Sequence, residues 1–146
     1  MKKLCLIVIV IATLFALSCG LERSNPLDPG NGNVKVPNLV TNIALSTSGQ
    51  GATEKYVNIS WDTLPQGGAD GYYIYRSRSH NGTFQLAAEI PNRLDSFYQD
   101  RKDIVAGPFF YKMSAFLYLN PDNPRPGDRL EGPLNIPPGS GIVVPQ

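Results

Sequence analysis

Short stretches in which apolar and polar residues alternate, separated by turn-forming residues, constrain the fold of this chain most. Val57, Ile59 and Trp61 alternate with Asn58 and Ser60, and a period of two predicts a strand with one buried face. The chain has 14 glycines and 13 prolines among its 146 residues, enough for many turns. It shows no heptads and no long amphipathic helix. The sequence therefore predicts an all-β domain.

Seven short strands are expected between residues 39 and 136. Their ranges are 39–45, 56–61, 70–76, 84–90, 96–100, 108–119 and 132–136. The Asn81-Gly82 pair predicts a tight hairpin between the third and fourth of them. In the fourth, Leu86, Ala88 and Ile90 fall on one face. Seven such strands over about 100 residues predict an immunoglobulin-like, seven-stranded β-sandwich.

The first 18 residues have the layout of a secretory signal. Lys2 and Lys3 form a positively charged start, and residues 4–17 are almost all apolar. The apolar run is shorter than the roughly 20 residues of a membrane-spanning helix. Small residues follow in Ser18-Cys19-Gly20, where a signal peptidase would cut.

A cysteine at that junction resembles the lipobox of bacterial lipoproteins. The resemblance implies cleavage before Cys19 and a diacylglycerol on its thiol, although Ala16 stands where that family favours leucine. An ordinary signal peptide and an uncleaved anchor remain the alternatives. In enteric lipoproteins an aspartate after the cysteine retains the protein in the inner membrane. Gly20 therefore implies the outer membrane of a bacterial envelope.

The rest of the chain divides into three further segments. Residues 19–35 are polar and turn-rich, which predicts a flexible tether. A domain is expected over 36–138 and a C-terminal tail over 139–146. Two of the 13 lysines and arginines lie in segment 1–18, so 11 remain against 12 acidic residues, a formal charge of −1. That balance predicts no nucleic-acid partner, because such a partner needs a clustered basic face.

Six ordered segments resemble strands of a fibronectin type III domain. They are Pro37-Asn38-Leu39, Val57-Asn58-Ile59-Ser60-Trp61, Gly71-Tyr72-Tyr73-Ile74-Tyr75-Arg76, Ser96-Phe97-Tyr98-Gln99-Asp100, Phe109-Phe110-Tyr111-Lys112-Met113-Ser114-Ala115 and Gly132-Pro133-Leu134. The resemblance covers roughly residues 36–138 and implies a non-catalytic interaction module. Phe109 stands at the tyrosine-corner position of that family. Pro126-Gly127-Asp128 stands where one member carries Arg-Gly-Asp, so no integrin binding is implied.

A binding surface is predicted on the outer face of the third and sixth strands. Alternation turns Tyr73 and Tyr75 outward, and Phe110 and Lys112 would share their face. Arg76 and Arg78 either extend this patch or are solvated edge residues. An exposed aromatic cluster can dock a protein or stack on sugar rings. The structural alternative is that cross-strand aromatic pairs simply stabilise the sheet. Loop 120–127 is a second candidate.

No catalytic, metal or cofactor site is predicted. His80 is the one histidine and lies in a turn. Asp95, Asp100 and Asp103 are the nearest approach to a carboxylate cluster, but they lack the pattern of a calcium loop. By its resemblance to fibronectin type III domains Asp100 ends a strand, and its expected role is to cap a turn.

Together these patterns predict a lipid-anchored envelope or cell-surface protein that acts as a non-catalytic interaction or adhesion module. Its predicted partners are the membrane, through Cys19, and an envelope protein or a glycan. A carbohydrate-binding accessory module, a structural subunit of an envelope complex and, last, a hydrolase are the alternatives.

Overall fold

Eight β-strands make up the regular structure of residues 35–135 and 141–146, which the computed structural model describes. The strands are β1 (Ala44–Thr47), β2 (Val57–Ser60), β3 (Gly71–Ser77), β4 (Gln85–Ile90), β5 (Phe97–Asp100), β6 (Gly107–Tyr118), β7 (Arg129–Glu131) and β8 (Gly141–Val144). None of the described residues lies in a helix. Val36–Gln146 forms one compact unit.

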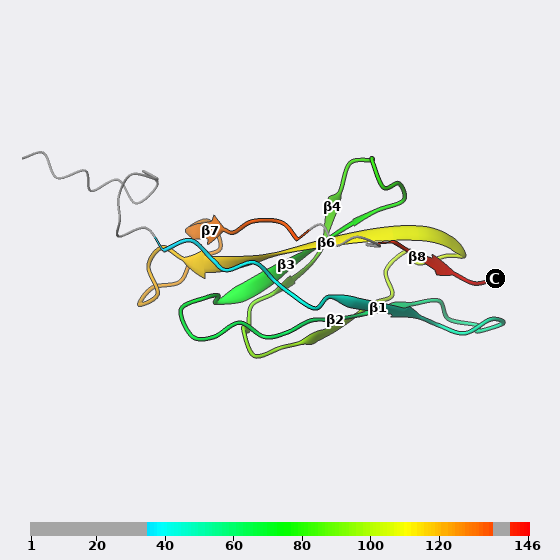
Figure 1. The fold of residues 1–146 in the computed structure, drawn as a ribbon, viewed down its shortest axis with the longest axis horizontal. Coiled ribbons are helices and arrows are strands. Elements are labelled where there is room, and N and C mark those ends of the chain that lie inside the picture. The colour runs from blue at the N-terminus through cyan, green and yellow to red at the C-terminus, as the bar shows by residue number, and fades with distance from the viewer. Residues whose placement is uncertain (1–34, 136–140) are drawn as a thin grey trace, which may run out of the picture. The chain divides into compact units, whose positions relative to one another are not determined.

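The strands form two antiparallel sheets (Figure 1). One sheet has the order β1-β2-β5, and the other has the order β4-β3-β6 with β7 and β8 both on the far side of β6. β7 pairs with the end of β6 and β8 with its beginning. The fourth strand lies beside the third, whereas in an immunoglobulin constant domain it belongs to the opposite sheet. The chain is therefore an all-β, immunoglobulin-like sandwich, as the sequence predicts.

The core lies between the sheets and follows the alternation of the strands. Tyr72 and Ile74 of β3 are buried, as are Phe109, Tyr111 and Met113 of β6. They meet residues of β2 and the segment after it, Val57, Ile59 and Trp61. Burying one such side chain contributes about 1.5–3 kcal/mol. The buried face that the alternation predicts for Val57, Ile59 and Trp61 is confirmed.

The Trp61 and Tyr72 rings anchor this core. They meet edge to face with their centroids 5.4 Å apart. The Tyr72 hydroxyl accepts a hydrogen bond from the backbone N–H of Leu64 and donates one to the carbonyl of Arg93, each 2.9 Å long. The buried hydroxyl is therefore satisfied, as a polar group in a core must be.

The first strand begins later than predicted. The range 39–45 was expected, but β1 spans Ala44–Thr47. Asn42 adopts a φ of 55°, in the left-handed region, which interrupts an extended strand. Val40 is nevertheless buried in the core from outside the strand.

The end of the domain also differs from the prediction. In place of one strand over 132–136, β7 and β8 lie along β6, and between them Gly132 and Asn135 donate backbone hydrogen bonds to β6 carbonyls. The predicted tail 139–146 is wrong for Gly141–Val144, which pairs with β6. The physical reason is that Val144 alternates into the core, where it is buried. The sandwich therefore extends beyond residue 138.

The register of β4 changes along its length. The pairing with β3 shifts between Ile74 and Tyr75, which a β-bulge accounts for. Ala88 and Ile90 pack against the core, whereas Leu86 is exposed. The common face predicted for these three residues therefore holds only for the last two.

Candidate functional site

The predicted outer face forms where β3 and β6 lie side by side. Tyr73 is opposite Ser114, Tyr75 is opposite Lys112, and Ser77 is opposite Phe110. Residues opposite each other in an antiparallel pair point to the same side of the sheet. The structure thus brings together Tyr73, Tyr75, Phe110 and Lys112, as the sequence predicts. All four are only half-buried rather than open to solvent.

Arg129 of β7 covers one half of this face. Its guanidinium donates hydrogen bonds to the Tyr73 and Tyr118 hydroxyls, at 3.1 and 3.2 Å, and its Cζ lies 4.4 Å from the centroid of Phe116. Its Nη1 also lies 2.7 Å from a carboxylate oxygen of Glu89. That pairing raises the pKa of Arg129 above its usual value. The side chain is only 6% exposed, so it closes the face over Tyr73.

Glu131 of β7 covers Tyr75. The Tyr75 hydroxyl donates a 2.8 Å hydrogen bond to Glu131, and the Ser114 hydroxyl donates to the same carboxylate oxygen. Burial, together with the Glu131 carboxylate, raises the pKa of Tyr75. The Tyr75 hydroxyl is therefore committed within the sheet rather than offered to a ligand.

The other end of the face is closed in a similar way. The His80 ring meets Phe110 edge to face, with centroids 5.7 Å apart. Gly141 of β8 lies so close to Phe110 that a Cβ there would come within 2.6 Å of the ring. Lys112 Nζ lies 4.0 Å from the centroid of Phe84. The aromatic residues thus contact other side chains of the same face, as the structural alternative expects, and a role in binding stays a prediction.

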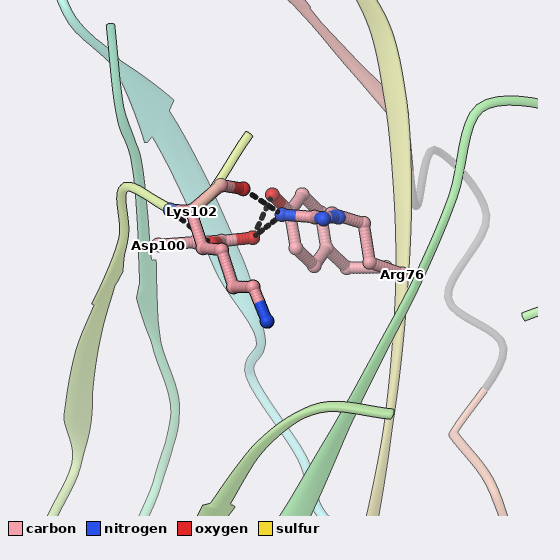
Figure 2. Close-up of polar contacts among 4 residues, drawn as sticks. Arg76, Asp100 and Lys102 are labelled. Carbon is pink, nitrogen blue, oxygen red and sulfur yellow. Dashed lines mark hydrogen bonds and ion pairs between the residues drawn. The ribbon is translucent and has the colours of Figure 1, made fainter. Parts of the chain in front are cut away.

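Arg76 does not extend this face. It is opposite Tyr111 and shares the inner side of β3 with Tyr72 and Ile74. Figure 2 shows its guanidinium reaching Asp100, with Nη1 2.8 Å from Oδ2, and the carbonyl of Lys102, 2.6 Å away. The placement of Arg76 on the outer patch is therefore wrong, because its charge has a partner between the sheets.

Asp100 is the centre of this inner polar cluster. The carboxylate is 1% exposed and also accepts a 2.9 Å hydrogen bond from the Tyr111 hydroxyl. Its other oxygen accepts from the backbone N–H of Lys102, the turn-capping role predicted for it. Burial, followed by the Asp100 charge, raises the pKa of Tyr111. Strand parity alone could have placed Arg76 on the inner side of β3, since it puts Tyr72, Ile74 and Arg76 on one side.

A polar cleft of about 410 Å³ opens beside Arg76, outside the core. It is bounded by the end of β3, the turn that follows and the start of β4. Its lining includes Arg76, Arg78, Thr83, Gln85, Asp103 and Phe109. A second cleft, of about 270 Å³, lies beside Tyr118 and is lined largely by Pro91, Pro121 and Pro124. Neither cleft was predicted, because each draws on segments far apart in the sequence.

The remaining candidates offer no reactive arrangement in the part of the chain that the structure describes. His80 is exposed, and its Nδ1 lies 2.9 Å from the side-chain oxygen of Asn81. No three of the described His, Cys, Asp and Glu residues group as metal ligands would. No helix within residues 35–135 and 141–146 is long and apolar enough to span a membrane. Cys19 and the tether lie outside the described residues.

Comparison with known proteins yields a similarity of fold. An Fn3-like protein from Clostridium thermocellum is similar in structure, with a TM-score of 0.46 and 20% sequence identity, over 68% of this chain and 88% of the other. No family model matches the chain, and no curated protein matches it. The assignment of the sandwich therefore rests on the strand order and pairing of this chain itself.

Proposed function

We propose that this protein is a lipid-anchored module of a bacterial envelope that binds a partner without catalysis. The observation that carries the proposal is the sequence Ser18-Cys19-Gly20 directly after an apolar segment and ahead of a single sandwich domain. A diacylglycerol on Cys19 with a further acyl chain on its amino group holds a protein firmly at a bilayer. One chain alone binds only marginally.

The polar segment 19–35 then acts as the tether of the sandwich. It is rich in glycine, proline and asparagine, a composition that disfavours a packed core. Its role is to hold the domain clear of the lipid headgroups, where a partner in the envelope can reach it.

Loop 120–127, between β6 and β7, is the surface that we propose for the partner. Each of its residues is exposed, and loops at the ends of a sandwich commonly carry recognition. The outer aromatic face is the weaker candidate, since the Tyr73 hydroxyl already accepts a hydrogen bond from Arg129 and the Tyr75 hydroxyl already donates one to Glu131. The same contacts weigh against sugar stacking on that face.

Intact mass of the membrane-extracted protein tests the anchor. The expected mass corresponds to a chain beginning at Cys19 with acyl chains attached, and Cys19→Ala should abolish both cleavage and lipid. Cys5→Ala is the matched control, because Cys5 lies inside the signal segment and should leave the mature mass unchanged. Cleavage without lipid, or an uncleaved chain, would overturn the proposal.

Membrane fractionation tests the outer-membrane assignment. The wild-type protein should sediment with the outer membrane, and Gly20→Asp should move it to the inner membrane if the sorting rule of enteric lipoproteins applies. Recovery of the wild-type protein in the inner membrane would contradict this assignment but leave the lipid anchor intact.

A further inference from the structure

The polar cleft beside Arg76 is large enough to admit a small molecule. Its volume of about 410 Å³ falls within the roughly 300–1,000 Å³ typical of ligand pockets. Its lining includes neither Cys19 nor the aromatic-face residues Tyr73, Tyr75, Phe110 and Lys112, so the inference below goes beyond the proposed function and does not depend on it.

Arg78 supplies a cation at this cleft. Its Cζ lies 4.2 Å from the centroid of the buried Phe109 ring, a cation–π contact that positions the guanidinium. Gly107, with a φ of 122°, leaves room for it, since a Cβ there would approach Arg78 Nη2 to 3.2 Å. None of the described carboxylates forms an ion pair with Arg78. The guanidinium is thus held in place with its charge unmatched by the described residues.

Arg76 supplies the second guanidinium at the cleft, and part of this group already binds within the protein. Nη1 of Arg76 contacts Asp100 and the Lys102 carbonyl, so Asp100 balances its charge. The remaining N–H groups of a guanidinium are still donors, and this side chain is 21% exposed. Arg76 therefore contributes hydrogen-bond donors to the cleft and little net charge.

Asp103 places an acceptor on the cleft wall. It is exposed and held at a φ of 56°, a left-handed conformation that aspartate tolerates better than most residues. No ion pair joins it to a described cation. Thr83 and Gln85 add a hydroxyl and an amide, each able to donate and to accept. The lining thus offers one unmatched cation, one unmatched carboxylate and several neutral polar groups.

We propose that this cleft binds an acidic sugar, a ligand that carries one carboxylate and several hydroxyl groups. The ligand carboxylate pairs with Arg78, in the forked geometry that arginine offers to carboxylates. The sugar hydroxyls hydrogen-bond to Asp103, Thr83 and Gln85. A neutral sugar leaves the charge of Arg78 unmatched. A simple anion leaves the hydroxyl-binding groups unused, and a cationic ligand meets the unmatched positive charge of Arg78.

Calorimetric titration of the full-length protein in mild detergent tests the proposal, with glucuronate and short oligogalacturonates as the probes. We expect saturable binding that Arg78→Gln weakens about 10- to 100-fold, the loss of a charge-assisted hydrogen-bonded pair. Arg101→Gln is the matched control, because Arg101 is exposed and lies outside the cleft. Asp103→Asn should weaken the binding of the acidic sugars and leave the urea midpoint of unfolding unchanged.

Four results would overturn the proposal, the last of them with glucose. The first is that none of the acidic sugars binds saturably to the wild-type protein. The second is binding that Arg78→Gln and Arg101→Gln affect equally. The third is competition by acetate or phosphate as strong as by glucuronate, which would indicate a simple anion site. Glucose binding at least tenfold more weakly than glucuronate would support the proposal, whereas equal binding would contradict it. None of these results bears on the lipid anchor.

Discussion

Arg76 Nη1 lies 2.8 Å from Asp100 Oδ2, and this ion pair joins the two sheets of the sandwich. Arg76 belongs to β3 in one sheet and Asp100 ends β5 in the other. Because Asp100 is almost fully buried, its charge depends on Arg76 and on the Tyr111 hydroxyl. The pair is therefore a feature of the fold rather than of the outer aromatic face.

Arg76→Met should lower the free energy of unfolding by about 2–3 kcal/mol, because it leaves the Asp100 charge buried and unpaired. Breaking a fully buried ion pair would cost more stability, but the Arg76 side chain is partly exposed. Urea unfolding measures the change. Arg101→Met is the matched control. The Arg101 and Glu54 side chains of its ion pair are 57% and 75% exposed, so this substitution should change the free energy of unfolding by less than about 1 kcal/mol. Equal losses in the two variants would contradict the assignment.

Tyr111 should make the domain sensitive to alkaline pH. Its pKa is raised in the folded state by burial and by Asp100, so the folded protein keeps a proton that the unfolded chain loses. The contribution is complete below the unfolded tyrosine pKa of about 10 and is lost as the pH rises above it.

Urea midpoints measured from pH 8 to 11 test this dependence. The wild-type urea midpoint should decrease as the pH rises above about 10. The midpoint of Tyr111→Phe should decrease less steeply, although this variant is less stable at pH 8. Because lysines also titrate in this range, the informative quantity is the difference between the two profiles. Parallel profiles would argue against Tyr111 as the source.

β8 should contribute to stability through Val144. Val144→Ala removes a side chain that is 1% exposed and should cost about 2 kcal/mol in the free energy of unfolding. The neighbouring Val143 is 68% exposed, so Val143→Ala should change it by less than about 0.5 kcal/mol. If neither substitution affects unfolding by urea, residues 141–144 do not belong to the cooperative unit.

Gly71 should be intolerant of a side chain. A Cβ there would lie 2.3 Å from the carbonyl oxygen of Ile90 and 2.4 Å from the Phe116 ring, so Gly71→Ala should destabilise the domain by about 1–3 kcal/mol or more. Gly49 has open space around it, and Gly49→Ala should be nearly neutral. Thermal unfolding of the two variants tests this prediction. A Gly71→Ala protein as stable as the wild type would contradict the close approach of Ile90 and Phe116 to Gly71.

Arg129 should stabilise the outer face more than an exposed arginine would. Arg129→Met removes its hydrogen bonds to Tyr73 and Tyr118 and its pair with Glu89. We expect a loss of about 1–3 kcal/mol. Arg125→Met, on the exposed loop, serves as the control, and equal stability of both variants would show that Arg129 is not a structural cover.

Much of the fold could be predicted because alternation is a local property. The positions of Tyr72 and Ile74 inward and of Tyr73 and Tyr75 outward follow from the period of a strand, whatever pairs with it. Strand ends were less predictable. Asn42 turns the chain before β1 by a local backbone conformation, and β8 follows a proline-rich segment that resembles the end of a domain.

The candidate site was less predictable because its surroundings come from distant segments. Arg129 and Glu131 lie more than 50 residues from Tyr73 and Tyr75, so nothing near the tyrosines in the sequence reveals what covers them. The cleft beside Arg76 likewise needs β3, β4, β6 and the turn after β5 to meet.

The sequence by itself determined the class of fold, the inner and outer faces of the strands and the expectation of a lipid anchor at Cys19. The tertiary structure alone decided which charges are matched. Arg76 faces inward and pairs with Asp100, while Arg78, two residues along, has no ion-pair partner among the described residues. The physical reason is that side-chain direction depends on the local backbone, whereas a charge acquires its partner only when strands distant in sequence pack together.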